Sequence, residues 1–257
     1  MLKSLCVGLS LFAWLALSVQ AQTVDATDAD EVRWQKSVHG FVWAGNRYWE
    51  STVNATADER SVLQGGVNIV LQKRQTKVVG KVWLSVSPEK THGKHWTGNA
   101  QELDLGLELQ QALAKGLVAK VGYSHFFITK SAGSDVEMVV LAVSKETALT
   151  EKNVLVGTFE FYQFLPTSSK GPAGGQFYLP SVAFSRTSGK WNTTAGLAVV
   201  RNSNGAFGLR SETAVRFTGQ VLYKLHHGQT GPDVTYGGVP QSQQRPMRTT
   251  FGWSWVF

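Results

Sequence analysis

Residues 103–110 read Leu-Asp-Leu-Gly-Leu-Glu-Leu-Gln, a strict alternation of leucine with polar residues or glycine. Successive side chains of a β-strand point to opposite faces, so one face would carry the leucines and the other Asp104, Gly106, Glu108 and Gln110. A helix would scatter the same leucines around its axis. The segment therefore predicts a strand with one apolar and one polar face.

The same period-two pattern recurs along the chain in segments of about ten residues, the length that a tilted strand needs to cross a membrane. After Ala21 no apolar stretch is long enough for a transmembrane helix. We therefore expect an all-β fold, a transmembrane antiparallel up-and-down β-barrel of about twelve strands. The expected strands are 37–46, 62–71, 76–87, 103–111, 117–128, 136–143, 153–164, 176–187, 190–200, 206–217, 219–227 and 247–257.

Long and short connections alternate between these segments. Bacterial barrels have short periplasmic turns and longer outer loops, and an even number of strands returns both termini to the periplasm. Both termini are therefore expected to be periplasmic, although 144–152 is long for a turn and 201–205 is short for a loop. The loop 228–246, rich in Gly and Pro, could fold inward as a constriction or project outward. The longer connections are 47–61, 88–102, 129–135, 165–175, 201–205 and 228–246, and the tight ones include 72–75, Ser188-Gly189 and Thr218-Gly219.

Aromatic residues lie near the ends of the predicted strands, where girdles at two membrane interfaces would require them. A soluble β-sandwich would instead bury its aromatic side chains in the middle of its strands. The pattern therefore favours a barrel whose apolar face meets lipid and whose charged face lines the lumen. The aromatic residues near strand ends are Trp43, Trp83, Tyr123, Phe127, Phe164, Tyr178, Trp191, Phe207, Phe217 and Tyr223.

The last nine residues, 249–257, read Thr-Thr-Phe-Gly-Trp-Ser-Trp-Val-Phe. At period two this places Phe251, Trp253, Trp255 and the terminal Phe257 on one face. The segment resembles the C-terminal targeting strand of bacterial outer-membrane barrels, in which a terminal Phe and alternating aromatics are read by the barrel-assembly machinery. The resemblance implies that these four residues form the assembly signal and that this machinery is a partner.

Two internal fragments and the strand spacing also resemble a protein family. The fragments are Leu-Gln-Gly-Gly-Val at 63–67 and Glu-Leu-Asp-Leu-Gly at 102–106. Together with the spacing they look like the TorF family of twelve-stranded porins. The resemblance implies a porin-like role.

The N-terminus has the features of a secretory signal peptide. Lys3 precedes an apolar run, and Val19-Gln20-Ala21 supplies the small residues of a cleavage site. We expect a signal peptide at 1–21, an acidic periplasmic leader at 22–36 and the transmembrane barrel at 37–257. Export through this signal places the barrel in the outer membrane of a Gram-negative bacterium, against membrane lipid and lipopolysaccharide.

Composition excludes several classes of function. The only cysteine, Cys6, lies in the signal peptide, so the mature chain can form no disulfide and no cysteine metal site. Cleavage also removes Lys3 and leaves 24 basic against 18 acidic residues, a formal charge of +6. These charges form no basic run, so we expect no nucleic-acid partner and no cofactor.

Signatures of a barrel enzyme are missing. The twelve-stranded phospholipase of the outer membrane carries His-x-Ser, and none of the six histidines here is followed by Ser at the second place. Ser37 and His39 share a face, but no acid can be named to orient the imidazole. His92 and His95 are only two possible ligands, fewer than zinc normally takes, so no metal site is expected. The chain is not expected to be an enzyme.

The charged face supplies the candidate functional residues. Neighbouring strands would bring lysines beside carboxylates, so cross-strand ion pairs can form. A basic ladder facing an acidic one would create a transverse field for polar solutes, whereas pairing alone would fill a closed interior. The leading hypothesis is a passive porin-like channel for small polar or weakly anionic solutes. The first alternative is a closed structural or adhesive barrel. A lipid-modifying enzyme of the outer membrane is the alternative ranked last. The predicted pore-lining residues are Lys77, Lys81, Asp104, Glu108, Lys120, Glu160, Arg210, Glu212, Arg216 and Lys224.

Overall fold

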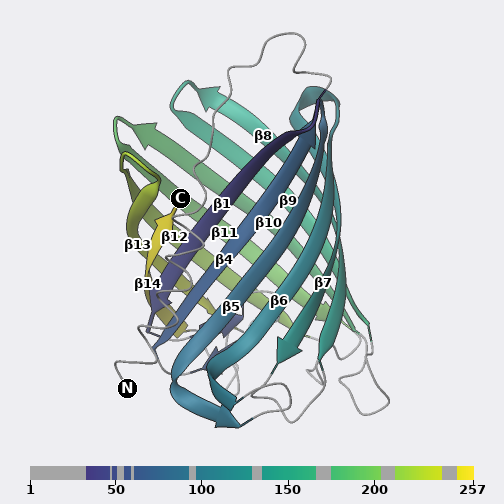
Figure 1. The fold of residues 1–257 in the computed structure, drawn as a ribbon. Coiled ribbons are helices and arrows are strands. Elements are labelled where there is room, and N and C mark those ends of the chain that lie inside the picture. The colour runs from purple at the N-terminus through teal and green to yellow at the C-terminus, as the bar shows by residue number, and fades with distance from the viewer. Residues whose placement is uncertain are drawn as a thin grey trace.

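A computed structural model describes residues 33–46, 48–50, 55–58, 61–92, 97–128, 135–165, 175–203, 212–238 and 248–257, with the backbone alone at 48–50, 55–58, 88–92 and 97–101. Twelve of its strands close into a barrel (Figure 1). The predicted signal peptide lies outside the described residues, as does most of the leader. The barrel strands are β1 (Gln35–Gly45), β4 (Val62–Lys73), β5 (Thr76–His92), β6 (Thr97–Ala112), β7 (Leu117–Ile128), β8 (Val136–Thr150), β9 (Asn153–Leu165), β10 (Gly175–Ser188), β11 (Trp191–Ser203), β12 (Thr213–Lys224), β13 (Gln229–Gly238) and β14 (Arg248–Val256).

Each barrel strand pairs antiparallel with its neighbours in the sequence, and β1 closes the ring against β14. The predicted all-β, twelve-stranded up-and-down barrel is therefore confirmed. A single turn of 3-10 helix, η2 (Ala114–Gly116), joins β6 to β7. Among the described helical segments none is long and apolar enough to span a membrane.

Connections at the two ends of the barrel differ in length, with one exception. At one end four strand pairs are joined by tight turns at 74–75, 151–152, 189–190 and 225–228, and η2 joins the fifth. At the other end the connections after the one that follows β1 are 93–96, 129–135, 166–174, 204–212 and 239–247, and 93–96 is as short as the turn 225–228. Both exceptions to the predicted rule disappear, because β8 runs on to Thr150 and the β11–β12 connection is longer than expected.

The predicted boundaries of the two strands that follow β11 were wrong, whereas those of the last strand were correct. Thr218 and Gly219, predicted as a turn, lie in the middle of β12, and β13 lies within the predicted loop 228–246. The alternation already favoured one continuous strand, since Phe217 and Val221 are four residues apart and therefore share a face. The Gly and Pro residues of β13 led to the prediction of a loop, because such residues usually interrupt strands.

The proline of β13 does interrupt the sheet locally. Pairing between β12 and β13 jumps from Gln220 opposite Asp233 to Tyr223 opposite Thr230, and the skipped residues of β13 are Gly231 and Pro232. Proline has no N–H to donate to a ladder. The strand nevertheless continues, because β14 pairs with Pro232 on its other side.

The outer surface of the barrel is a belt of exposed apolar side chains, including Leu107, Phe159 and Phe251. Aromatic pairs lie toward both ends of it, with Trp191 against Tyr223 near the tight turns and Phe161, Phe217 and their partners near the longer connections. Such an apolar belt is typical of a surface covered by lipid.

Three of the predicted girdle residues instead belong to the inner face. Trp43 donates a hydrogen bond across the inner wall to Asp233, Trp83 lies opposite Gly66 in register, and Phe164 is only 4% exposed within an apolar cluster. A position near a strand end does not indicate whether a side chain points into or out of the barrel. That direction depends on whether the residue is at an odd or an even position along the strand.

The seam between β1 and β14 closes the barrel near its C-terminus. Gly40 and Phe257 exchange two backbone hydrogen bonds, of 2.8 and 2.9 Å. The ring of Phe257 covers Gly40 so closely that a Cβ at this glycine would lie 2.1 Å from the ring. The start of β1 and the end of β14 thus lie at the same end of the barrel, the one with the tight turns (Figure 1).

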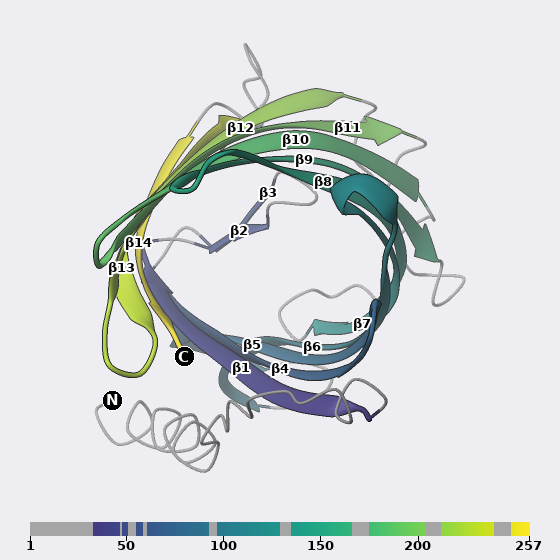
Figure 2. The same ribbon diagram turned by 90° about the horizontal axis from the view of Figure 1, so that it is seen from above.

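The long connection after β1 contains a small hairpin that the sequence did not predict. It is formed by β2 (Tyr48–Glu50) and β3 (Ala55–Asp58), which pair as a separate two-stranded sheet. Seen from above, the hairpin lies within the ring of barrel strands (Figure 2). Part of the connection after β1 therefore projects over the lumen, and residues 239–247 of the predicted loop 228–246 lie outside the described residues.

Candidate functional site: an ion-pair ladder on the inner wall

Four charged side chains of the inner wall form a continuous ladder of alternating sign. Lys81 lies on β5, Glu108 on β6, Lys120 on β7 and Glu160 on β9. Period-two alternation turns all four inward, because their neighbours along each strand carry the exposed apolar belt. The ladder therefore follows from the same pattern that produces the lipid-facing surface.

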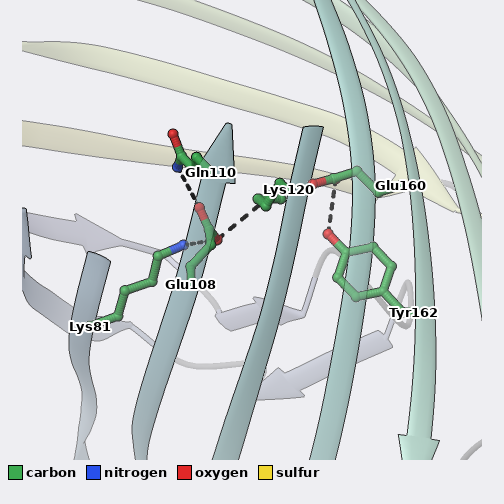
Figure 3. A network of polar contacts seen from close by, with 6 residues as sticks. All are labelled: Lys81, Glu108, Gln110, Lys120, Glu160 and Tyr162. Atoms are coloured by element: carbon green, nitrogen blue, oxygen red, sulfur yellow. Dashed lines mark hydrogen bonds and ion pairs between the residues drawn. The ribbon is translucent and has the colours of Figure 1, made fainter. Parts of the chain in front are cut away.

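The ladder is held by three ion pairs (Figure 3). The Nζ of Lys81 lies 2.6 Å from Oε2 of Glu108, and the Nζ of Lys120 lies 3.8 Å from the same oxygen. On its other side the Nζ of Lys120 lies 2.9 Å from Oε1 of Glu160. Glu108 and Lys120, the two middle residues of the ladder, thus each have a partner of opposite sign on both sides.

Small residues lie beside the charges and give them room to meet. In register, Lys81 lies opposite Gly106 and Glu108 opposite Gly122. Lys120 lies opposite Ala142 on β8, and Ala142 in turn lies opposite Glu160 on β9. Lys120 can therefore reach over a methyl group to a carboxylate two strands away.

Two further polar side chains complete the network. The amide of Gln110 donates to Oε1 of Glu108, and the hydroxyl of Tyr162 donates to Oε2 of Glu160 at 2.9 Å. Sequence reasoning did not select either residue. Each lies two positions from a selected carboxylate and therefore on the same face, which was the available signal.

The lysines are more exposed than the carboxylates that they bind. The side chain of Lys81 is 41% exposed and that of Glu108 only 5%; Lys120 is 23% exposed and Glu160 17%. Ion pairs of this kind hold the charges in place, and a larger fraction of each lysine side chain than of its carboxylate partner is exposed. A pocket of about 320 Å³ lies beside Lys120 and Glu160, lined also by Gln110, Ser144 and Thr158.

The other predicted pore-lining residues lie apart from this ladder. Lys77, in register with Gln110, lies near the tight turns, and Asp104 lies on β6 toward the other end. Glu212, Arg216 and Lys224 belong to the β12 side of the ring. Arg210 lies outside the described residues. Their role as a pore lining stays a prediction.

The transverse-field hypothesis does not describe the ladder, because its two signs alternate within one wall. Toward the longer connections the inner face of β8 to β12 becomes apolar. Phe164 and Phe177 pack edge to face at 5.2 Å between ring centres, in a cluster on β8 to β12. Tyr162 packs against this cluster while its hydroxyl binds Glu160, so it marks the boundary between the apolar and charged zones.

The possible catalytic pair does form a contact. Ser37 Oγ and His39 Nε2 lie 3.0 Å apart in an exposed position near the tight-turn end. Within the described residues no carboxylate is hydrogen-bonded to His39, so the orienting member of a triad is not found there. In the same part of the chain no group of three His, Cys, Asp or Glu could hold a metal ion.

A closed barrel with an apolar outer belt and a charged inner wall defines the protein as a β-barrel of the outer-membrane type. No family model and no curated protein matches the chain, so the TorF resemblance stays a prediction. The architecture is similar to that of solved outer-membrane proteins. An outer membrane channel from Pseudomonas putida F1 aligns with a TM-score of 0.54 and 10% identity, over 91% of this chain and 98% of that one.

Two further structures have the same architecture. A bacterial polysaccharide outer membrane secretin aligns with a TM-score of 0.52 and 8% identity, over 86% of this chain and 97% of that one. The NanC porin aligns with a TM-score of 0.50 and 8% identity, over 84% and 97%. At such identities the likeness establishes the fold alone, and the fold is that of outer-membrane barrels.

Proposed function

We propose that the protein is a porin-like channel of the bacterial outer membrane that admits small polar or weakly anionic solutes. The observation that carries the proposal is the ladder from Lys81 to Glu160 on the inner wall of a closed barrel. Charged side chains at a pore wall replace part of the hydration of a passing solute. We further propose that lipopolysaccharide surrounds the barrel and that the barrel-assembly machinery inserts it.

The proposed preference for anions follows from the exposure of the ladder. Its charges balance in number, but the side chains of Lys81 and Lys120 are more exposed than the side chain of Glu108. A solute on the axis therefore meets a weakly positive wall. The expected selectivity is slight, because each lysine remains paired.

The test is conductance of the refolded protein in a planar bilayer, with the reversal potential measured in a salt gradient. Wild type should give steady steps and a slight anion preference, and the double variant Lys81→Gln with Lys120→Gln should lose that preference. Lys145→Gln is the control, since Lys145 is exposed on β8 and shares the outer face with Leu141 and Val143. A correctly folded barrel that never conducts would overturn the proposal.

A second candidate function is a closed structural or adhesive barrel. The β2–β3 hairpin within the ring favours it, because an inward segment reduces the open cross-section (Figure 2). Deleting 48–58 distinguishes the two functions. A partly open channel should conduct more after the deletion, whereas a closed barrel should conduct only after it.

A further inference from the structure

A second polar pocket lies on the inner wall at the seam where the barrel closes. Its volume is about 330 Å³, within the range of small-molecule sites. It faces a different part of the ring from the ladder, which runs from β5 to β9. The lining residues come from β1, β4 and β12 to β14 and include Trp43, Gln64, Arg216, Asp233, Thr250 and Ser254.

The indole of Trp43 lies flat against this wall because the residues beneath it are glycines. A Cβ on Gly45 would come within 1.8 Å of the ring, and one on Gly252 within 2.2 Å of Nε1. Neither strand could carry a side chain here without displacing the indole. The ring therefore packs over the backbone of both strands while Trp43 also lines the pocket.

The edge of the indole is fixed by a carboxylate. Nε1 of Trp43 donates to both oxygens of Asp233, at 2.9 Å each, across the intervening strand β14. Ser254 on β14 donates to Oδ2 of the same carboxylate at 2.7 Å. A carboxylate has about four acceptor positions, so Asp233 retains capacity for a hydroxyl of a ligand.

Other polar groups surround the ring. Arg216 contributes a guanidinium to the lining. The Nε2 of Gln64 and the Oγ1 of Thr250 have no hydrogen-bond partner among the described residues, although Thr250 is only 3% exposed. Buried polar atoms of this kind are costly and are normally satisfied by water or by a ligand.

We propose that this pocket binds a polyhydroxylated ring of the pyranose type. Such a ring has an apolar C–H face, which can stack on the indole of Trp43, and equatorial hydroxyls that both donate and accept. Asp233 would accept from these hydroxyls, and Arg216 and Gln64 would donate to them. The proposal rests on the proposed channel function, because a solute reaches this wall through the lumen.

Other classes of ligand would contact fewer of the groups that line the pocket. A cation could stack on Trp43 and approach Asp233, but the guanidinium of Arg216 would repel it. A purely aromatic ligand would stack but leave the polar groups of Asp233 and Gln64 without partners. A sugar ring matches both the flat apolar face and the mixed donors and acceptors.

The test is saturation-transfer difference NMR of the folded full-length barrel in detergent, with D-glucose as the probe. Sorbitol is the matched control, since it has the same kinds of hydroxyl but no ring face. We expect transfer to the axial protons of glucose and little to sorbitol. In Trp43→Leu binding should weaken about tenfold, the loss expected for a stacking contact. Trp191→Leu, on the outer face, should bind as wild type does.

A second variant covers the case in which Trp43→Leu fails to fold. Gln64→Ala leaves the contact between Trp43 and Asp233 intact and should also weaken glucose binding severalfold. Equal signals from glucose and sorbitol, or glucose binding unchanged in both variants, would overturn the site.

Conductance of the same preparations separates this inference from the proposed function. A conducting barrel that does not bind glucose overturns the site and leaves the channel. A silent barrel that binds glucose through Trp43 overturns the channel and supports the site. A silent barrel without binding overturns both.

Discussion

Lys120 on β7 and Glu160 on β9 form an ion pair of 2.9 Å across the whole width of the intervening strand β8. The residue of β8 between them is Ala142, which is 7% exposed and lies in register with both. The pair therefore depends on a small side chain in a third strand.

Enlarging that side chain should break the pair. In Ala142→Leu the added atoms would occupy the path of the Lys120 side chain, and we expect a loss of about 1–3 kcal/mol in the free energy of unfolding. Ala195→Leu on the exposed outer face is the matched control and should cost little. Unfolding in urea, followed by circular dichroism, measures both. Equal stability of the two variants would show that the pair does not depend on this space.

Glu108→Gln should make the channel more selective for anions. This carboxylate is shared by Lys81 and Lys120, so its neutralisation leaves one uncompensated positive charge on the wall. We expect the ratio of anion to cation permeability to rise about twofold, measured from reversal potentials. Glu137→Gln is the control, because Glu137 pairs with His125 on the outer face. An unchanged ratio in Glu108→Gln would contradict a conducting path along this wall.

The alternation of connections predicts the orientation of the barrel. Cys6 is the only cysteine, so in a Cys6→Ser background each new cysteine is the only thiol. Ser168→Cys, in the connection between β9 and β10, should react with an impermeant maleimide on intact cells. Ser188→Cys, at the tight turn after β10, should react only after the outer membrane is permeabilised. The opposite pattern would reverse the predicted periplasmic placement of the termini.

Phe257→Ala separates two roles of the C-terminal residue. The variant keeps the backbone hydrogen bonds to Gly40 and removes the ring that covers this glycine. If Phe257 belongs to an assembly signal with Phe251, Trp253 and Trp255, the folded fraction in cells should fall severalfold. Refolding into detergent, without any machinery, should change little.

The outcome that would contradict the assembly signal is an equal loss in cells and in detergent, because that result assigns the ring to packing of the seam. Leu225→Ala is the control for removing an exposed apolar side chain near the tight-turn end. It should leave both measurements unchanged.

Part of the ladder could be predicted from sequence, and part could not. Tight turns fix the register of the two strands that they join, so the proximity of Glu108 to Lys120 followed from the turn between β6 and β7. The connection between β5 and β6, residues 93–96, lies outside the described residues, yet the alternation of both strands placed Lys81 and Glu108 on one face. Glu160 was selected as an inward residue, but its contact with Lys120 was not foreseen, because it spans an intermediate strand.

The pocket at the seam between β1 and β14 could not be predicted from the sequence, for a different reason. Trp43 was assigned to a membrane girdle, and Asp233 lay in a segment interpreted as a loop. Their contact joins residues 190 positions apart in the chain. Only closure of the ring brings β1 beside β14 and within reach of β13.

The sequence by itself determined the period of two, the even number of strands and the inward or outward direction of most side chains. The period and the direction of the side chains are local properties, since each depends only on the backbone geometry of the strand concerned, and the number of strands follows from counting the alternating segments. The tertiary structure decided which inward residues meet, where β13 lies and what faces the lumen. Those features depend on the register around a closed ring, which is set jointly by all twelve strands and by the seam that joins the first to the last.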